Sequence, residues 1–298
     1  MLTFSSMRRF MFFFLGSFLL THFVKAIALA EDKNDEKSLL WRISGKGMQR
    51  PSYLFGTMHL LCKDDFLWTP AMESALAQVE EVCFEMDIND PSLSMQIAMG
   101  MIHMDGKKLR DYFTEEEYTL VERFVTDSLS MNMVMLQQMK PAALLTLFAT
   151  KVINCMDPIS YESKILEIAL QLEKTVSGLE TAQEQIALFD RMPGDSVVKE
   201  LVSMAKDYQE ERFEYNKMLR AYKSQDISAL YDRVAAARES GADMNIFLDE
   251  RNVLWIERME EKMEQNPVFF AVGAGHLGGE NGLISLLRQH GYKVEPVK

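Results

Sequence analysis

Two glycine–histidine elements stand out among the residues that could carry chemistry. Gly56 and His59 form one Gly-x-x-His element near the start of the chain, and Gly273 and His276 form another near its end. Each follows an extended apolar run, and a glycine allows the sharp turn and close backbone approach that lift the histidine out of a strand. Open α/β sheets bind ligands at the carboxyl edge of their strands, so we expect both histidines there. The structural alternative for each is a buried, hydrogen-bonded histidine.

Carboxylates end a further apolar run and could act together with these histidines. Glu85 and Asp87 lie near the end of residues 81–86 and point to one face of a strand. Two histidines and Glu85 make a set that suits a catalytic zinc or similar divalent ion with an open position for water. A metal-free site, in which a histidine is the general base and Glu85 orients it, is the competing interpretation. The structural alternative is a strand-end carboxylate that pairs with an arginine or caps a helix.

Extended patterns at both ends of the chain must position these residues. Near the start, residues 40–44 and 52–57 indicate a hairpin around a glycine turn, and a proline-initiated helix leads into a strand at 81–86. This order of strand, loop, helix and strand is a βαβ-like unit. Near the end, residues 268–272 predict an apolar strand, followed by a glycine loop, a helix and a last strand at 292–295.

Between these two pieces the chain is mostly helical. Residues 91–265 carry helical patterns with breaks at prolines and glycines, and residues 175–179 indicate a short strand. Neither α/β piece could bury a core alone, so we expect them to form one sheet. The predicted fold class is α/β, with a mixed central sheet formed by the N- and C-terminal parts and a large helical insertion or cap from the middle of the chain.

The first thirty residues predict a signal peptide. Arg8 and Arg9 precede an apolar run at 10–24, and Ala28-Leu29-Ala30 is a cleavage signal. The run is shorter than the roughly 20 residues of a transmembrane helix, so we expect cleavage after Ala30 rather than anchoring. The expected product is a secreted or periplasmic protein with no stable membrane span, folded as a single domain over residues 31–298.

The charge balance restricts the partners. The full chain has 32 basic and 44 acidic residues, and removal of Arg8, Arg9 and Lys25 with the signal peptide would change its net charge from −12 to −15. Nucleic acids and anionic lipid surfaces require cationic patches on a protein. The sequence therefore argues against nucleic acid as a partner and favours a peptide or small-molecule substrate.

The cysteines and methionines leave alternatives open. Cys62, Cys83 and Cys155 are an odd number and exclude a complete disulfide framework, so one bridge at most can form and buried thiols are equally consistent. A methionine-rich stretch runs from Met131 to Met139. Core packing is its ordinary interpretation, an adaptable wall for a peptide or lipid is the second, and soft-metal binding is the third.

Five blocks of the sequence resemble the motifs of the TraB/GumN family, in the expected order and across essentially the whole mature chain. They are SYLFGTMHL at 52–60, FEMD at 84–87, GLET at 178–181 with Gln185, DERN at 249–252, and VGAGHL at 272–277 with Gly291-Tyr292.

The resemblance implies a fold and an activity. The family includes the Tiki proteins, membrane-linked metalloproteases that need two Gly-x-x-His motifs and a glutamate, and it is related in fold to erythromycin esterases and a haem-binding lipoprotein. Carried over by position, the metal or base residues are His59, Glu85 and His276. Glu180 and Arg251 are implied as supporting site residues, and two further motif residues, Asn252 and Gln185, accompany them. The chain has no C-terminal membrane helix of the Tiki kind, so substrate and location need not transfer.

Together, the residues and the resemblance predict a metal-dependent hydrolase that acts as a peptidase. A divalent ion (Mn, Co or Zn) would sit on His59, Glu85 and His276, polarise a carbonyl and activate water. Arg251, whose charge is fixed, would hold a substrate carboxylate or the developing oxyanion, and Glu180 would be a ligand, a base or an orienting partner. The alternatives are a metal-free esterase-type hydrolase with His59 as base, and a secreted protein that binds a peptide or haem without turnover.

Overall fold

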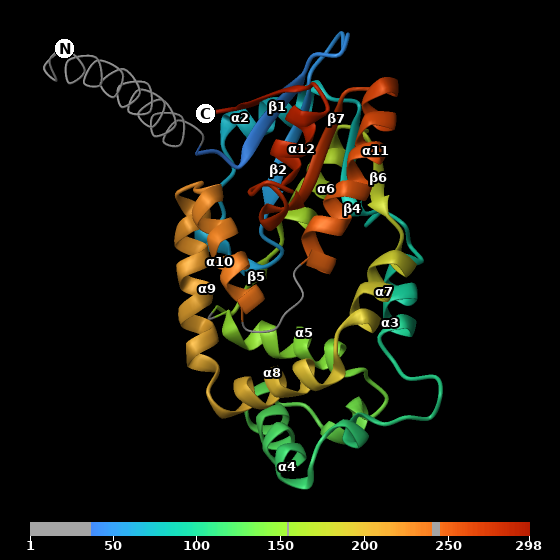
Figure 1. Ribbon diagram of the computed structural model, residues 1–298, viewed down its shortest axis with the longest axis vertical. Coiled ribbons are helices and arrows are strands. Elements are labelled where there is room, and N and C mark those ends of the chain that lie inside the picture. The colour runs from blue at the N-terminus through green and yellow to red at the C-terminus, as the bar shows by residue number, and fades with distance from the viewer. Residues whose placement is uncertain (1–36, 154, 240–244) are drawn as a thin grey trace, which may run out of the picture. The chain divides into compact units, whose positions relative to one another are not determined.

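A mixed six-stranded sheet forms the centre of the computed structural model, which describes residues 37–153, 155–239 and 245–298. The strand order is β6-β4-β7-β2-β1-β8 (Figure 1). β6, β4, β7 and β2 run parallel, while β1 pairs antiparallel with β2 and β8. The predicted α/β class and its mixed sheet from both ends of the chain are confirmed. The strands are β1 (Leu40–Ser44), β2 (Ser52–Thr57), β4 (Glu81–Met86), β6 (Thr175–Glu180), β7 (Val268–Gly273) and β8 (Lys293–Pro296).

One strand of the sheet comes from the middle of the chain. β6 lies at the edge of the sheet beside β4, so the helical insertion is interrupted rather than continuous. Gly178 permits this close pairing, because a Cβ at that position would lie 2.5 Å from the backbone nitrogen of Asp87. The carboxyl end of β6 thereby reaches the same sheet edge as that of β4.

Alternating side chains of β2 divide the interior into two hydrophobic cores. Tyr53 and Phe55 pack on one face of the sheet, and Leu54 packs on the other. This period of two is the geometry of a strand, and burial on both faces explains the continuous apolar sequence of β7. α2 (Pro70–Gln78) and α6 (Tyr161–Gln171) contribute to the first core, while α11 (Glu250–Gln265) and α12 (Leu283–Gln289) contribute to the second.

The helical insertion has a core of its own. Leu109, Phe124, Phe148 and Leu201 are buried together between its helices. α5 and α8 pack against each other, and α4 packs on α8, below the sheet in Figure 1. The helices of this part are α3 (Leu93–Gly100), α4 (Glu115–Arg123), α5 (Pro141–Val152), α7 (Ala182–Arg191), α8 (Gly194–Lys206), α9 (Tyr208–Lys223) and α10 (Ile227–Glu239).

Short elements complete the described chain. β3 (Leu61–Cys62) and β5 (Pro158–Ile159) pair antiparallel in a separate two-stranded sheet. The single-turn elements are 3-10 helices at Lys63–Asp65, Leu109–Tyr112, Met133–Leu136 and Ala274–His276, and π-helical turns at Phe124–Ser128 and Asn245–Asp249.

Residues Ser38–Lys298 form one compact unit. The predicted signal peptide, residues 1–30, lies outside the described residues. Its cleavage, and the boundary between it and a single domain over residues 31–298, therefore stay predictions. Within the part of the chain that the structure describes, every helix is too short or too polar to cross a bilayer.

A disulfide joins the β3 segment to the segment that precedes β5. Cys62 and Cys155 are bonded, with their Cα atoms 5.8 Å apart and a sequence separation of 93, while Cys83 is a buried free thiol. The structure thus selects one bridge and one buried thiol from the alternatives that the odd cysteine count left open.

Loss of this bridge should destabilise the protein. The double substitution Cys62→Ala and Cys155→Ala should lower the free energy of unfolding by about 2–5 kcal/mol, because the bridge closes a long loop in the unfolded chain. Urea unfolding with and without reductant measures this. Wild type and Cys83→Ala should both lose stability on reduction, whereas the double variant should not respond. An unchanged urea midpoint in the double variant would contradict the assignment.

Candidate active site

The carboxyl ends of four parallel strands bring the candidate residues to one sheet edge. Glu180 ends β6, Glu85 lies one residue before the end of β4, Gly273 ends β7 and Thr57 ends β2. The pairing register aligns Met86 with Glu180 and Thr57 with Gly273. Both Gly-x-x-His turns follow at this edge, which is the position that the sequence predicted.

Arg251, in the first turn of α11, lies at the centre of the cluster. Its Nη2 donates to Glu85 Oε2 at 2.6 Å and to Glu180 Oε1 at 2.5 Å, and its Nε donates to Glu180 Oε2 at 3.2 Å. Its Nη1 donates to the carbonyl of Phe247 at 3.0 Å. The guanidinium also stacks over the Trp255 ring at 4.5 Å. One nearly buried cation therefore joins two nearly buried carboxylates.

Glu180 is satisfied on every side. Besides Arg251, it accepts from Trp255 Nε1 at 3.3 Å and from Gln185 Nε2 at 2.9 Å. Its side chain is only 4% exposed. Because buried carboxylates are costly unless hydrogen bonds and a counter-charge compensate them, this arrangement fixes Glu180 in one orientation. Glu180 therefore acts on the rest of the cluster chiefly by holding Arg251 in place.

Glu85 is the carboxylate that faces both histidines. Its Oε1 accepts from the backbone nitrogen of Gly273 at 2.8 Å and lies 3.8 Å from His276 Nε2. Burial alone would raise the pKa of Glu85. At the low pH where Glu85 titrates, the protonated form of His276 acts together with Arg251, His59 and the Gly273 hydrogen bond. Their combined effect outweighs burial and lowers the pKa of Glu85 to about 2. Glu85 is thus ionised under physiological conditions.

His276 is buried and neutral. Its Nδ1 lies 2.6 Å from Asn252 Oδ1, and the Asn252 amide nitrogen donates to the carbonyls of His276 and Asn281. Asn252 Oδ1 therefore accepts a hydrogen bond from the Nδ1–H of His276, which leaves Nε2 as an acceptor, 3.2 Å from Arg251 Nη1. Burial, with the Arg251 charge, lowers the pKa of His276 to about 3, even though Glu85 opposes this shift.

His59 is held differently, by a residue that the sequence did not single out. Its Nδ1 bonds Glu162 Oε1 at 2.8 Å. The sequence predicted that Glu85 orients a histidine, but the hydrogen bond to His59 comes from Glu162, and Glu85 bonds Gly273 and Arg251. Desolvation lowers the pKa of His59, but the hydrogen bond and charge of Glu162 outweigh it and raise the pKa above its ordinary value.

The position of Glu162 in the first turn of α6 gives no sign in the sequence that it contacts His59. An acidic residue two positions after an N-cap serine is ordinary helix-start chemistry, and Ser160 caps α6 in this way. Only the fold reveals that the carboxylate also bonds a histidine 103 residues earlier in the chain.

Gly273 leaves open the point on which the predicted metal residues converge. A Cβ built at Gly273 would lie 3.3 Å from Glu85 Oε1, 3.5 Å from His59 Nε2 and 3.7 Å from His276 Cδ2. The structure therefore brings all three predicted metal residues around one small space, while Arg251 contacts Glu85 and His276 and joins them to Glu180. A side chain larger than hydrogen at position 273 would fill that space.

The residues fit a divalent ion in kind. Two imidazoles and a carboxylate are a common donor set, and each imidazole has its Nδ1 fixed by an oxygen, but His276 Nε2 lies 3.2 Å from Arg251 Nη1, so a metal could bind this nitrogen only after Arg251 had moved. Their present spacing is wider than a coordination shell: among the described residues, no three His, Cys, Asp or Glu side chains are grouped closely enough to hold a metal. Arg251 occupies the space beside His276 Nε2 and Glu85 Oε2.

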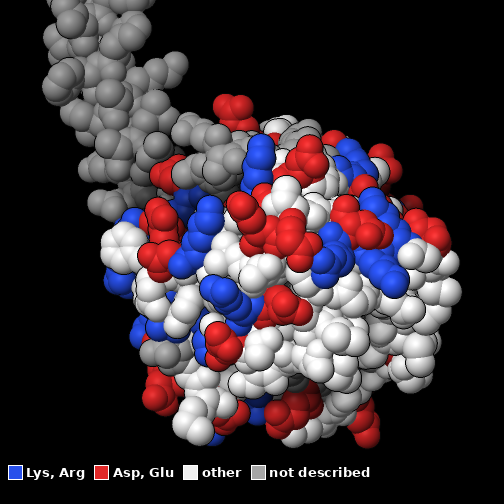
Figure 2. Space-filling model, turned by 90° about the horizontal axis from the view of Figure 1, so that it is seen from below, with Lys and Arg blue, Asp and Glu red and all other residues white. Residues whose placement is uncertain are grey.

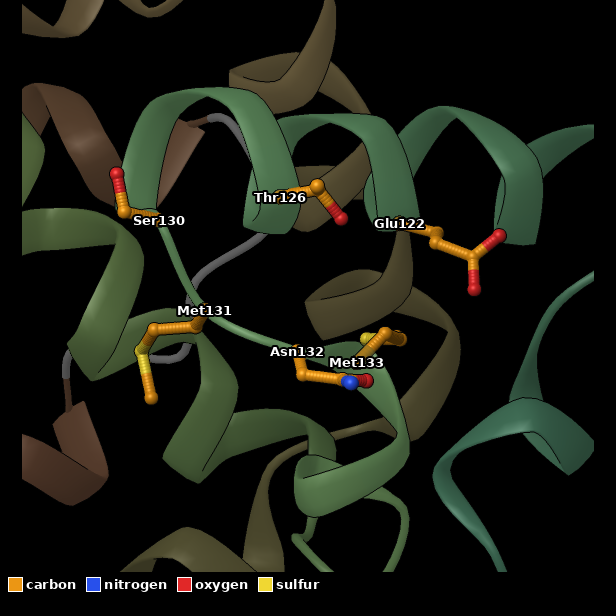
Figure 3. Close-up of a pocket in the computed structure, with 6 residues that line it drawn as sticks. All are labelled: Glu122, Thr126, Ser130, Met131, Asn132 and Met133. Atoms are coloured by element: carbon orange, nitrogen blue, oxygen red, sulfur yellow. The ribbon is translucent and has the colours of Figure 1, made fainter.

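A cavity of about 650 Å³ adjoins this cluster. Glu180, Asp87 and Arg258 contribute to its lining, beside α3 and α7. Another cavity, of about 440 Å³, lies on the insertion and is lined by Met131 and Met133 (Figure 3). Met133 is buried, as core packing requires, and the Met131 sulfur lies apart from it, which gives no support to a soft-metal site.

Charges of both signs are interspersed over the face of the molecule seen in Figure 2. Ion pairs between exposed side chains, such as Arg191 with Glu250, occur in the part of the chain that the structure describes. The prediction that nucleic acid is not a partner stays a prediction.

The protein is thus of the α/β class, with a cluster of His, Glu and Arg side chains at the carboxyl edge of its central sheet. The chain belongs to the TraB/PrgY/gumN family, whose description matches residues 39–296. It is similar to the metalloprotease TIKI2 of Danio rerio (21% identical over 88% of this chain and 61% of the relative). It is similar as well to TIKI2 of Xenopus tropicalis (22%, 90% and 61%) and to the metalloprotease TIKI1 of Homo sapiens (21%, 90% and 63%).

The chain spans about three-fifths of the length of these curated relatives. No solved structure matches it. Membership of the family rests on the match over residues 39–296.

Removal of Arg251 should be far more damaging than removal of an exposed arginine. Arg251→Met would leave Glu85 and Glu180 buried without their cation, and should cost about 3–5 kcal/mol of unfolding free energy. Arg50→Met is the control, because Arg50 and its partner Glu80 are 54% and 50% exposed and the pair should be worth at most about 1 kcal/mol. Denaturant unfolding of both variants measures the difference. Equal losses would contradict a central role for Arg251.

The Arg251 effect should also depend on pH. The folded pKa of Glu85 is about 2, below the ordinary value of 4.5, so the stabilisation by its ionised form is fully present above pH 4.5 and is lost as the pH falls toward 2. The stability gap between wild type and Arg251→Met should therefore shrink over that range. A gap that stays constant from pH 6 to pH 2.5 would show that Glu85 does not depend on Arg251 for its charge.

Proposed function

We propose that the protein is a hydrolase that works with a divalent metal ion, and that its substrate is a peptide. The observation that carries this proposal is the convergence of His59, Glu85 and His276 on the space in front of Gly273, with both imidazoles fixed through Nδ1. The similarity to TIKI2 and TIKI1, which are named as metalloproteases, supports the same class.

Each residue would have a defined task. His59, Glu85 and His276 would hold the ion, and Asn252 and Glu162 keep the two imidazoles in orientation. A bound Mn, Co or Zn ion would supply Lewis acidity toward a carbonyl and activation of water. The N–H groups of Arg251 are directed at Glu180, Glu85, His276 and the Phe247 carbonyl, so Arg251 would hold these residues in place and supply positive charge beside a carbonyl oxygen.

The bridge between Cys62 and Cys155 supports a secreted or periplasmic location. Disulfides persist in oxidising compartments and are rare in the cytosol. This location, the cleavage of the signal peptide and the peptide substrate belong to the proposal.

A metal-free hydrolase is a second candidate, favoured by the pair of His59 and Glu162. A histidine that is bonded to a carboxylate is a common general base. However, Glu162 raises the pKa of His59, so both ring nitrogens are protonated at neutral pH. In this charged form His59 is better suited to donate a proton than to act as a base. The third candidate, a protein that binds a peptide or haem without turnover, has no feature of its own in the described site.

Metal analysis distinguishes these candidates. The protein, purified without chelator or metal-affinity tag, should contain about one divalent ion per chain. It should hydrolyse a peptide library, lose activity with chelator and recover it with one metal. His276→Ala should lose both metal and activity, whereas the exposed His290→Ala should keep both.

The other outcomes identify the alternatives. Activity that survives chelator but not His59→Ala would indicate the metal-free hydrolase. Retention of a ligand without turnover, after metal has been restored, would indicate a binding protein.

Filling the space at Gly273 gives an independent test. Gly273→Ala should abolish metal binding and lower activity by at least about tenfold, because the new Cβ would meet Glu85 and His59. Its effect on stability should be about 1 kcal/mol or less, since only flexible side-chain ends must shift. Gly194→Ala, whose Cβ would make ordinary contacts with Tyr112, is the control. Full activity in Gly273→Ala would place the reaction elsewhere.

A further inference from the structure

Hydrogen bonds to both carboxylate oxygens fix the side chain of Glu162. Thr57 Oγ1 donates to its Oε1 at 2.6 Å, and Ser160 Oγ donates to its Oε2 at 2.7 Å. The side chain is 17% exposed. With both oxygens engaged, the carboxylate cannot rotate freely, and Oε1 stays directed at His59 Nδ1, 2.8 Å away.

The backbone holds the two segments together as well. Leu61 pairs with Ile159 and Cys62 pairs with Pro158 across the two short strands β3 and β5. The disulfide to Cys155 adds a covalent tie between the same segments. These links lie within a few residues of His59 on one side and of Glu162 on the other, so the distance between the two side chains is set by the fold.

α9 supports the His59 loop from a second direction. Tyr222 donates its hydroxyl proton to the carbonyl of Gly56 at 2.9 Å, and Tyr215 donates to the carbonyl of Leu60 at 3.2 Å. The backbone on either side of His59 is therefore fixed, while the ring itself is 69% exposed. Within the described part of the chain, the bond to Glu162 is the hydrogen bond that fixes the rotation of this ring and the position of its proton.

We propose that Glu162 is the positioning residue of His59: it keeps the proton of the neutral ring on Nδ1 and turns Nε2 toward the space in front of Gly273. Nε2 lies 3.5 Å from the position of a Cβ at Gly273. The use of this orientation in metal binding rests on the proposed function, whereas the orientation itself does not. His276 has an amide, Asn252, at the same ring position, so the two imidazoles differ in the charge of their partners.

A purely structural role for Glu162 makes a different prediction. Its carboxylate lies in the first turn of α6, where negative charge stabilises a helix. If that were its whole role, replacement would lower stability and leave the His59 ring unchanged. The state of the ring therefore separates the two roles.

The test uses the folded, metal-free, full chain. Glu162→Ala and Glu162→Gln are compared with Glu167→Gln, a control on the same helix whose carboxylate contacts Lys164 and Gln171. Two-dimensional NMR of the imidazole nitrogens at alkaline pH, where the ring is neutral, reports which nitrogen of His59 carries the proton. We expect Nδ1 in wild type and in Glu167→Gln, a mixture dominated by Nε2 in Glu162→Ala, and an intermediate state in Glu162→Gln, since an amide oxygen can still accept.

Zinc titration of the same proteins gives the second measurement. Affinity should fall about 10- to 100-fold in Glu162→Ala, less in Glu162→Gln, and not in the control. If Glu162→Ala does not fold, the isosteric Glu162→Gln decides by the same two measurements. An unchanged His59 proton position in the folded variants would overturn the proposal. If no protein binds zinc or hydrolyses peptide, the proposed function fails, while the NMR result still decides the role of Glu162.

Discussion

The ion-pair cluster around Arg251 is the interaction on which the site depends. Two buried carboxylates, from β4 and β6, approach the same guanidinium, which also contacts His276 and the Trp255 ring. Charges of this kind are tolerated in an interior only when they are paired and hydrogen-bonded. The cluster consequently specifies how α11 sits over the sheet and how closely β6 must approach β4, and it keeps Glu85 ionised.

The two histidines of the site are unlike each other. His276 is buried, neutral and bound to an amide, whereas His59 is exposed and bound to a carboxylate that favours its charged form. A metal that bound both would have to displace a proton from His59, so its affinity should rise with pH. The arrangement combines one rigid position inside the fold with one that solvent and substrate can reach.

Local patterns made much of this predictable. The apolar strands, the hairpin and the glycine turns depend on near neighbours in the chain, so their positions could be read from the sequence. Family motifs identified Glu85, Glu180 and Arg251 as neighbours. The partner of His59 could not be found in that way, because Glu162 resembles any acid in a first helical turn. The pairing of Cys62 with Cys155 and the place of β6 at the sheet edge also depend on contacts between distant segments, which no local pattern encodes.

The place of β7 in the sheet has a consequence for how the protein comes into being. β7 lies between β2 and β4, so these two early strands are not partners of each other and remain apart until the chain has been made as far as Val268. Ribosomes release a chain from its N-terminus, so the central sheet cannot close during most of synthesis. Until then β2 and β4 each keep one unpaired edge, which is a position where an unfinished chain can pair wrongly and aggregate.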